Sequence, residues 1–198
     1  MEILILYYSR TGAVQSLAQH LGRGVSSIEG MTPRIRTVPP VSSVTEATEN
    51  QIPETGFPYV CETDLTECDG IALGSPTRFG HMAAPLKYFL EQTTSQWLSG
   101  TMSGKPACVF TSSSSLHGGQ ESTLLSMMLP LLHHGMLIVG LPYTEQELSD
   151  TKTGGSPYGA THFTGPQNQS RLDNTEKQLA QKLGARLALT AKRLRSNP

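Results

Sequence analysis

The chain of 198 residues is poor in charge, in cysteine and in long apolar runs, and each shortage excludes a class of protein. Charged residues make up 16% of the sequence, against about 25% in an average soluble protein, which excludes a disordered chain dominated by charge. The formal net charge is −1, whereas nucleic-acid-binding proteins usually carry a basic excess. We therefore expect no nucleic-acid partner.

Long apolar runs are missing from the whole sequence. A helix that crosses a bilayer needs about 20 predominantly apolar residues in a row, and no segment approaches that length. The N-terminal run, residues 3–6, is also shorter than the apolar region of about 7–15 residues in a secretory signal peptide. We therefore predict a cytoplasmic protein without a membrane span.

Several motifs of catalysis and metal binding are absent. The three cysteines, Cys61, Cys68 and Cys108, form no C-x-x-C pair, and Cys108 lies in an apolar run where we expect it to be buried. The six histidines show no H-E-x-x-H spacing, so we expect no metal site. The sequence also lacks the G-x-G-x-x-G, Walker A and G-x-S-x-G patterns of dinucleotide binding, P-loop enzymes and serine hydrolases.

The sequence does contain five strand patterns that alternate with helical patterns. Continuous apolar runs are typical of parallel strands covered on both faces, and they lie at residues 2–8, 70–74, 106–110 and 136–139. Residues 34–38, after Gly30 and Pro33, predict a short second strand. Apolar residues at helical spacing predict helices at 14–28, 85–90, 121–132 and 179–194, the third broken or bent near Pro130. This alternation predicts a doubly wound α/β sandwich.

Two stretches interrupt the alternation. Residues 39–66 are rich in proline, threonine, serine and glutamate, and residues 144–170 are rich in glycine. Such compositions are typical of irregular surface segments. We predict that residues 1–198 form a single domain with insertions at about 39–66 and 144–170.

Three loops are expected to meet at one edge of the sheet, because ligands of open parallel sheets bind beyond the carboxyl ends of the strands. Residues 9–13 place two hydroxyls and a glycine before a helix, which suits a phosphate monoester. Residues 75–80 offer an arginine and an aromatic ring, and residues 111–119 offer small residues that let the backbone approach a flat ring. Each loop alone also fits a helix cap or an ordinary turn. Their occurrence together favours a ligand site.

Five strings in this order resemble the WrbA family of flavodoxin-like, FMN-binding NAD(P)H:quinone oxidoreductases: Tyr7–Gly12, Gly74–Gly80, Gly118–Glu121, His133–Met136 and Pro157–Thr161. The resemblance covers nearly the whole chain, both insertions included. It implies a flavodoxin-like three-layer sandwich, with helices on both faces of a five-stranded parallel sheet. It also implies FMN as cofactor, NADH or NADPH as co-substrate, and two-electron reduction of quinones to hydroquinones by ping-pong hydride transfer.

The resemblance implies a set of site residues. The residues expected to bind FMN are Ser9, Arg10, Thr11, Gly12, Ala13, Val14, Pro76, Thr77, Arg78, Phe79, Gly80, Ser112, Ser113, Ser114, Ser115, Gly118 and His133. Of these, residues 9–14 would hold the phosphate and the others would surround the isoalloxazine. His133 would also be the catalytic residue, over the ring where quinone and nicotinamide alternate. Trp97 would line the quinone pocket of a neighbouring subunit, which implies a homotetramer, with a dimer in equilibrium as the alternative.

The chain departs from the family at two places. Family members often carry Tyr where this chain has Thr11, and that ring contacts the nicotinamide nucleotide. The third loop is one residue longer here, with Leu116 and His117 where family members tend to carry Gly and Thr. The first departure affects the nicotinamide contact, and the second affects contacts at the ring edge.

From the residues alone, other roles stay open. A histidine such as His133 at a helix C-terminus also suits the helix dipole, and Trp97 also fits core packing. Arg78 fits either a salt bridge to an acidic neighbour or a partner for a reduced flavin anion. A flavodoxin-type electron carrier is an alternative function, although such carriers are strongly acidic and this chain is not. A non-catalytic FMN-binding regulatory or interaction protein is the other alternative.

Overall fold

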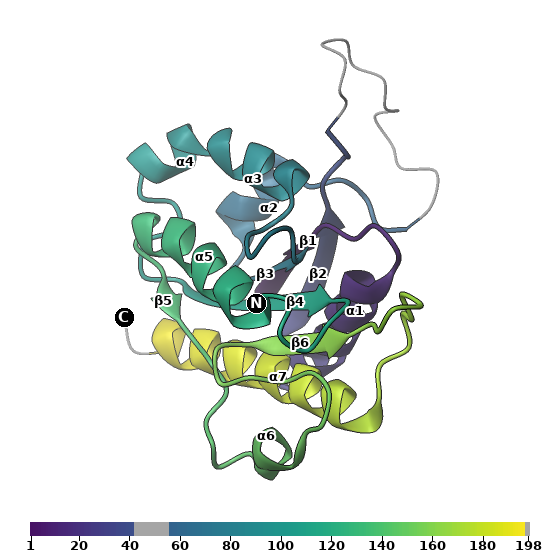
Figure 1. Cartoon of the computed structure of the whole chain (residues 1–198). Coiled ribbons are helices and arrows are strands. Elements are labelled where there is room, and N and C mark those ends of the chain that lie inside the picture. Colours follow the sequence, from purple (N-terminus) through teal and green to yellow (C-terminus); the bar gives the residue numbers. More distant parts are fainter. Residues whose placement is uncertain (42–55, 197–198) are drawn as a thin grey trace.

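A computed structural model describes residues 1–41 and 56–196 of the chain. Helices and strands alternate from the N-terminus onward (Figure 1). In chain order they are β1 (Glu2–Tyr7), α1 (Ala13–Ser26), β2 (Thr32–Thr37), α2 (Glu62–Glu67), β3 (Gly70–Pro76), α3 (Ala84–Glu91), α4 (Thr94–Leu98), β4 (Pro106–Ser113), α5 (Gln120–His133), β5 (Leu137–Ile138), α6 (Gln146–Asp150), β6 (Ala160–Phe163) and α7 (Asn174–Ser196).

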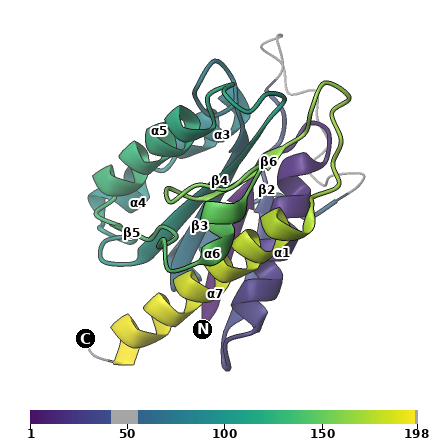
Figure 2. The ribbon, with the colours of Figure 1, turned by 60° about the horizontal axis from the view of Figure 1, so that its bottom comes forward.

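The strands form one parallel sheet in the order β2-β1-β3-β4-β5, with β6 also paired to β4. The winding direction reverses between β1 and β3, where doubly wound sheets bind their ligands. Helices α3, α4 and α5 cover one face of the sheet, and α1 and α7 cover the other (Figures 1 and 2). The predicted three-layer, flavodoxin-like sandwich is therefore confirmed.

The prediction of five strands is corrected at the fifth position of the sheet. There β5 pairs only with Pro106 and Ala107, at the start of β4, and β6 pairs with residues 110–113 at its end. The two segments thus share one position, and the stretch predicted to be irregular, 144–170, contains both α6 and β6. β6 was missed because it has four residues, two of which are polar, Thr161 and His162.

Three further elements differ from the prediction. Helix α2 lies within the stretch 39–66 that was predicted to be irregular; residues 42–55 of that stretch lie outside the described residues. Helix α4 has only five residues, too few to show a helical period. Helix α5 continues through Pro130 to His133 without a break.

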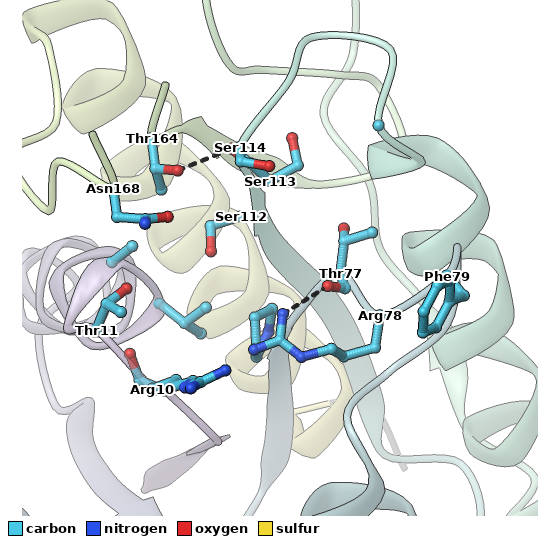
Figure 3. A pocket seen from close by; sticks show the side chains of 15 residues that line it. Arg10, Thr11, Thr77, Arg78, Phe79, Ser112, Ser113, Ser114, Thr164 and Asn168 are labelled. Carbon is cyan, nitrogen blue, oxygen red and sulfur yellow. Dashed lines mark hydrogen bonds between the residues drawn. The ribbon is translucent and has the colours of Figure 1, made fainter. Parts of the chain in front are cut away.

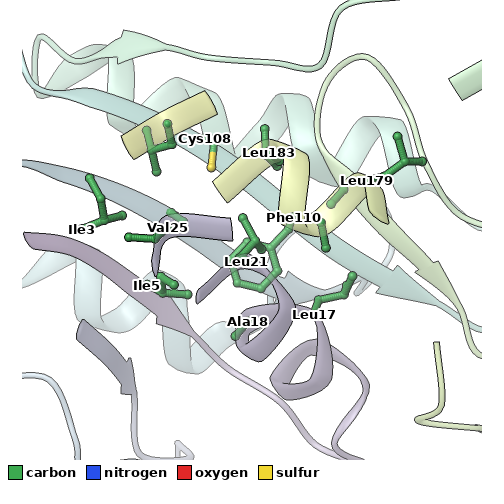
Figure 4. Close-up of a cluster of buried hydrophobic side chains, with 14 of the residues drawn as sticks. Ile3, Ile5, Leu17, Ala18, Leu21, Val25, Cys108, Phe110, Leu179 and Leu183 are labelled. Carbon is green, nitrogen blue, oxygen red and sulfur yellow. The ribbon is translucent and has the colours of Figure 1, made fainter. Parts of the chain in front are cut away.

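The apolar core has one half on each face of the sheet. In β1, Ile3 and Ile5 belong to the half under α1 and α7, whereas Leu4 and Leu6 belong to the half under α3 and α5. This division explains why the strand is apolar at every position from Ile3 to Leu6. Phe110 fills the first half between Leu17, Leu21 and Leu183 (Figure 4), and Cys108 is fully buried there, as predicted.

Helices α1 and α7 touch through two glycines. A Cβ atom at Gly24 of α1 would collide with the carbonyl oxygen of Gln181 of α7. A Cβ atom at Gly184 of α7 would collide in the same way with the carbonyl oxygen of Leu21. The two backbones are therefore in direct contact, which fixes α1 and the loop before it relative to the start of α7.

Within residues 1–41 and 56–196, no helix combines the length and the apolar character that crossing a membrane requires.

Candidate functional site

A cavity of about 580 Å³ opens at the carboxyl edge of the sheet, where β1, β3, β4 and β6 end (Figure 3). Its volume lies in the range of small-molecule sites, roughly 300–1,000 Å³. Its lining residues are Ser9, Arg10, Thr11, Ala13, Val14, Pro76, Thr77, Arg78, Phe79, Ser112, Ser113, Ser114, Gly118, Thr164 and Asn168. All three predicted loops therefore meet at one cavity.

The first wall is the turn that leads into α1. Gly12 stands at the N-cap with φ +88°, and no side chain caps the helix. The backbone N–H of Gly12 donates to the Ser9 hydroxyl at 3.1 Å, which fixes the turn. The first turn of α1 contains no acidic residue, so its amide groups and its dipole favour an anion at this end of the cavity.

Two arginines add positive charge to the cavity. Figure 3 shows the guanidinium groups of Arg10 and Arg78 turned toward each other. Arg78 donates to the carbonyl oxygen of Thr77 at 2.9 Å, and within the described part of the chain neither arginine forms a salt bridge. The salt bridge considered for Arg78 from the sequence is therefore not formed there. Uncompensated guanidinium groups favour an anionic ligand.

The hydroxyl of Thr77 is oriented by buried neighbours. The Thr123 hydroxyl donates to Thr77 Oγ1 at 3.1 Å, and the Thr111 hydroxyl, 3.4 Å from Thr77 Oγ1, donates to the carbonyl oxygen of Ser75 at 2.7 Å. Because the single proton of Thr111 goes to Ser75, the hydroxyl of Thr77 donates its proton to Thr111 Oγ1 and keeps one lone pair free. Thr77 can therefore present a hydrogen-bond acceptor to a ligand at the cavity floor.

Phe79 stands at the rim of the cavity in an unusual conformation. Its φ is +50°, a region that bulky residues rarely adopt, and its side chain is fully exposed. The two backbone bonds between Arg78 and His81, at 2.8 and 2.9 Å, close the tight turn that holds it. The turn therefore holds an exposed aromatic face where a flat ring can stack.

The serine-rich loop after β4 is ordered by its own side chains. The Ser113 hydroxyl donates to the carbonyl oxygen of Ser115 at 2.7 Å and accepts from the buried Gln120 amide at 2.7 Å. The backbone N–H of Gly118 also donates to the carbonyl oxygen of Ser115, at 3.1 Å. These bonds turn Ser112 and Ser114 toward the cavity while Ser115 supports the turn.

The fourth wall was not predicted. Thr164 and Asn168 come from the segment that follows β6, inside the stretch that the sequence indicated to be irregular. Thr164 is tied to β4 by a backbone N–H bond of 2.9 Å to the carbonyl oxygen of Ser113. Asn168 has φ +51°, a conformation that asparagine adopts more readily than most residues. The glycine and proline of Gly165-Pro166 indicated a turn, but no sequence pattern placed it beside β4.

Four residues predicted to bind the cofactor do not line the cavity, namely His133, which is described below, and three residues of the loops, Gly12, Gly80 and Ser115. Gly12 shapes the turn before α1 and borders a neighbouring hollow. Gly80, with φ +79°, packs against Gly119 behind the Arg78 turn. Ser115 supports the third loop through its carbonyl oxygen. All three act on the shape of the loops, so any contact of theirs with a ligand stays a prediction.

His133 and Trp97 lie at a different cavity of about 460 Å³, between α3, α4 and the end of α5. Helix α5 begins near the first cavity and His133 is its last residue, so the two are separated by roughly 20 Å at 1.5 Å per residue. Within one chain, His133 is therefore not beside the first cavity. Nearby, burial, with a contribution from His133, lowers the pKa of His134, whose Nε2 bonds Thr93 Oγ1 at 3.0 Å.

The donor set of the first cavity fits a phosphorylated flat ring. Hydroxyls, backbone amides and two guanidinium groups can hold a phosphate and polar ring edges, and the exposed face of Phe79 can stack on a ring. None of its described lining residues is Asp, Glu, His, Cys or Lys. The cavity can therefore bind and orient such a group, but one chain supplies it with no side chain suited to general acid–base catalysis.

Comparison with known proteins gives the same family. A family model described as NADPH-dependent FMN reductase matches residues 1–144. An NAD(P)H dehydrogenase (quinone) of Solidesulfovibrio magneticus is 41% identical over 203 residues, covering 99% of this chain and 100% of that protein. A protein of the same name from Syntrophobacter fumaroxidans is 41% identical over 204 residues, with both chains covered completely.

Solved structures support the fold. A flavodoxin, WrbA-like protein from Agrobacterium tumefaciens superposes with a TM-score of 0.68 at 22% identity, covering 97% of this chain and 98% of its own. Oxidised flavodoxin 2 from Bacillus cereus superposes with a TM-score of 0.62 at 16% identity, covering 96% of this chain and 99% of its own. At these identities the likeness shows the flavodoxin-like fold alone.

Proposed function

The chain belongs to the NADPH-dependent FMN reductase family and to the NAD(P)H dehydrogenases (quinone) that it matches over their full length, and we propose that it reduces quinones to hydroquinones with NADH or NADPH through bound FMN. The observation that carries this function is the first cavity. It joins an uncapped helix N-terminus, two arginines that form no salt bridge with the described residues, and an exposed aromatic ring at the switch point of the sheet. No other described cavity combines these features.

The residues of the cavity have separable roles in this proposal. The turn at residues 9–14 holds the phosphate through backbone amides and the Ser9 and Thr11 hydroxyls. Arg78 donates hydrogen bonds to the polar edge of the ring, Thr77 accepts one there, and Phe79 flanks the open side of the ring. FMN, when bound, supplies the two-electron hydride chemistry that no amino-acid side chain provides. The cationic side chains stabilise negative charge on the reduced ring.

The open shape of the site supports the ping-pong order that we propose. The cavity is open to solvent on the side of Phe79, whose side chain is fully exposed. One open ring face can accept nicotinamide and quinone only in turn, so the first product leaves before the second substrate binds. Because position 11 is Thr, the first loop supplies no aromatic ring to the open side of the cavity. Phe79 is therefore the aromatic residue of this cavity that can contact nicotinamide or quinone.

A homotetramer would bring the second cavity to the first. His133 and Trp97 share a cavity of about 460 Å³ on the α3–α5 face, remote from the first cavity of their own chain. That face also exposes Leu125, Leu129 and Leu132 of α5, which lie on one side of the helix. Packing these side chains against another copy would bury them and place His133 and Trp97 over the flavin of that copy. His133 would then donate a hydrogen bond to the quinone oxygen.

The deciding experiment is an anaerobic titration of the FMN-loaded protein with NADH, followed by benzoquinone. We expect the visible flavin absorption to bleach on addition of NADH and to recover on addition of quinone. A flavin that binds but stays oxidised in excess NADH and NADPH would contradict the enzymatic function and favour an electron carrier or a non-catalytic module.

Phosphate recognition is tested separately with Arg10→Gln and a matched control, Arg23→Gln, which changes an exposed arginine in α1. Loss of one charge-assisted bond lowers affinity by roughly 10–100-fold. We expect Arg10→Gln to weaken binding of FMN by that factor and to leave binding of riboflavin, which lacks the phosphate, unchanged. Equal losses for the two ligands would contradict a phosphate contact at Arg10.

A further inference from the structure

His162 of β6 is held at both ring nitrogens by hydrogen-bond acceptors. Its Nδ1 lies 2.7 Å from a carboxylate oxygen of Glu176, and its Nε2 lies 2.8 Å from the carbonyl oxygen of Gln169. A neutral imidazole can donate from only one nitrogen, whereas the imidazolium donates from both. Both side chains of the pair are 2% exposed. Glu176 accepts three backbone N–H groups, which favours its ionised form, and beside an ionised Glu176 the two bonds of His162 require an imidazolium.

The carboxylate partner is fixed by the backbone around it. Glu176 accepts the backbone N–H groups of Gly154, Phe163 and Asp173, each at 3.0 Å. Asp173 in turn accepts the N–H of Glu176 at 2.8 Å, so the two acids form a capping box at the start of α7. Glu176 therefore stays in place whether or not the imidazole is charged, and His162 is anchored from that side.

The second ring nitrogen reaches the cavity wall. Gln169 closes a turn whose other bond runs from its own N–H to the carbonyl oxygen of Thr164, at 2.9 Å. Between these two residues lies Asn168, which lines the cavity together with Thr164. The bond from His162 Nε2 to the carbonyl oxygen of Gln169 thus links this turn to the side chain of a buried residue of β6.

Charged groups approach His162 mainly from the start of α7 and the segment before it. Glu176 and Asp173 face it from the start of α7, and Arg171 from the segment before α7 lines the same small hollow. Its partner across the sheet, Ser112 of β4, is uncharged. The exposed Lys152 precedes the neighbouring Thr153. The titratable group of α1, His20, contacts Gln181 instead.

We propose that His162 is a positioning residue for the cofactor: its imidazolium holds residues 164–169 in the shape that places Thr164 and Asn168 in the wall of the FMN cavity. The inference rests on the FMN binding proposed above. When the imidazolium loses its proton, one of its two bonds is lost, and the bond to the neutral carbonyl oxygen of Gln169 is weaker than the bond to the carboxylate. Deprotonation therefore frees the turn, and FMN affinity falls as the pH rises.

Two substitutions separate the two bonds. His162→Gln keeps a donor near the Nε2 position, toward Gln169, and His162→Asn keeps a donor near the Nδ1 position, toward Glu176. Both substitutions remove the same buried charge, so the difference in FMN affinity between the two variants reports the hydrogen bond to the carbonyl oxygen of Gln169. We expect His162→Asn to bind FMN about tenfold more weakly than His162→Gln, the equivalent of one hydrogen bond. In FMN-free protein at pH 6, we also expect the amide of Gln169 to exchange with solvent faster in His162→Asn.

The pH dependence of flavin binding distinguishes the proposed role of His162 from a purely structural one. FMN and riboflavin affinities are measured by flavin fluorescence between pH 5.5 and about 9, a range that spans the ordinary histidine pKa. Riboflavin removes the titration of the phosphate itself, which also falls near pH 6. We expect unaltered protein to lose affinity for both ligands with rising pH and His162→Gln to give a flat riboflavin profile. His20→Gln, at the other buried histidine that the structure describes on this face, is the control and keeps the unaltered profile.

The outcomes are distinguishable. Equal FMN affinities and equal Gln169 exchange rates in His162→Asn and His162→Gln would overturn the role given to His162 and leave the proposed function intact. Failure of the unaltered protein to bind FMN would overturn both the role and the function.

Discussion

The indole Nε1 of Trp97 donates a hydrogen bond to the main-chain carbonyl oxygen of His133, 2.8 Å away, and so ties α4 to the end of α5. The two residues predicted to serve the quinone are therefore neighbours, although 36 positions separate them in the sequence. They form one unit, and that unit is remote from the cavity of its own chain at the carboxyl edge of the sheet. Any role in catalysis therefore has to be exerted on another copy.

Trp97→Ala is expected to impair quinone reduction without affecting flavin binding. Removing the indole empties part of the proposed quinone platform, so we expect KM for benzoquinone to rise about 2- to 12-fold, the equivalent of one aromatic contact of 0.5–1.5 kcal/mol. Leu98→Ala removes a more exposed apolar neighbour that does not line the cavity and is the control. An unchanged KM in assembled Trp97→Ala would remove Trp97 from the quinone site.

Leu129→Lys is expected to separate the subunits. Leu129 is 60% exposed on the α3–α5 face, and a charge there would be buried without a partner on assembly. Light scattering after gel filtration should show a smaller particle that still binds FMN but reduces quinone poorly. Leu194→Lys places the same charge on α7, in the opposite layer, and should leave the particle size unchanged. A monomeric unaltered protein with full activity would contradict the proposed assembly.

Gly24→Ala is expected to destabilise the fold by about 1–3 kcal/mol, because the added methyl group collides with the backbone of α7. Gly22→Ala, in the same helix, is the matched control. Its Cβ would lie 3.3 Å from the flexible end of Ile35, and the gain in helix propensity of up to about 1 kcal/mol offsets that contact. Urea unfolding of both variants checks the difference. Equal stabilities would contradict direct backbone contact between α1 and α7.

The buried His162–Glu176 pair is expected to give stability a maximum in mildly acidic solution. Burial lowers the pKa of His162, but its bonds to Glu176 and to the carbonyl of Gln169 outweigh burial and raise it above the ordinary 6.5. Burial raises the pKa of Glu176, but hydrogen bonds from His162 and the N–H of Phe163 outweigh it and hold that pKa below the ordinary 4.5.

The sign of the pH dependence follows from these two directions. The contribution of His162 is complete below pH 6.5 and disappears as the pH rises through its raised pKa. The contribution of Glu176 is complete above pH 4.5 and disappears as the pH falls through its lowered pKa. Urea unfolding at a series of pH values should show that the unaltered protein exceeds His162→Gln in stability most between these limits. A difference that grew toward alkaline pH would contradict the imidazolium.

Asp64→Ala is expected to destabilise the edge of the sheet by about 1–3 kcal/mol. The Asp64 side chain is 2% exposed, contacts Arg34 and Arg36 at 3.3 and 3.1 Å, and caps α2 through the N–H of Cys61 at 2.9 Å. Glu67→Ala removes a carboxylate that contacts Arg34 but is 60% exposed, so its loss should change stability by less than about 1 kcal/mol. Similar losses of stability in the two variants would show that the burial of Asp64 does not increase its contribution to stability.

The sequence predicted those parts of the site that directly follow long apolar strands. Thr77 and Ser112 stand at the ends of β3 and β4, so recognising each strand also placed its loop at the carboxyl edge. Thr164 and Asn168 could not be predicted, because β6 has four residues and is held in the sheet by pairing with β4 and not by its own pattern. His133 lies away from the cavity because it stands at the far end of α5. The sequence pattern predicted that helix but not how far its end lies from the cavity.

The shared fifth position of the sheet has a consequence for how this protein can change. Ile138 and Ala160 pair with Ala107 and Phe110, so the chain leaves and rejoins β4 at points about 10 Å apart, three residues at 3.3 Å each. The entropy of closing a loop rises only with the logarithm of its length. A change of length within residues 139–159 therefore adds little closure entropy, whereas the buried side chains of Val139, Leu141 and Leu148 and the bond of Gly154 to Glu176 tie the segment to the core. In evolutionary terms its exposed positions are free to vary in length beside a cavity that stays the same.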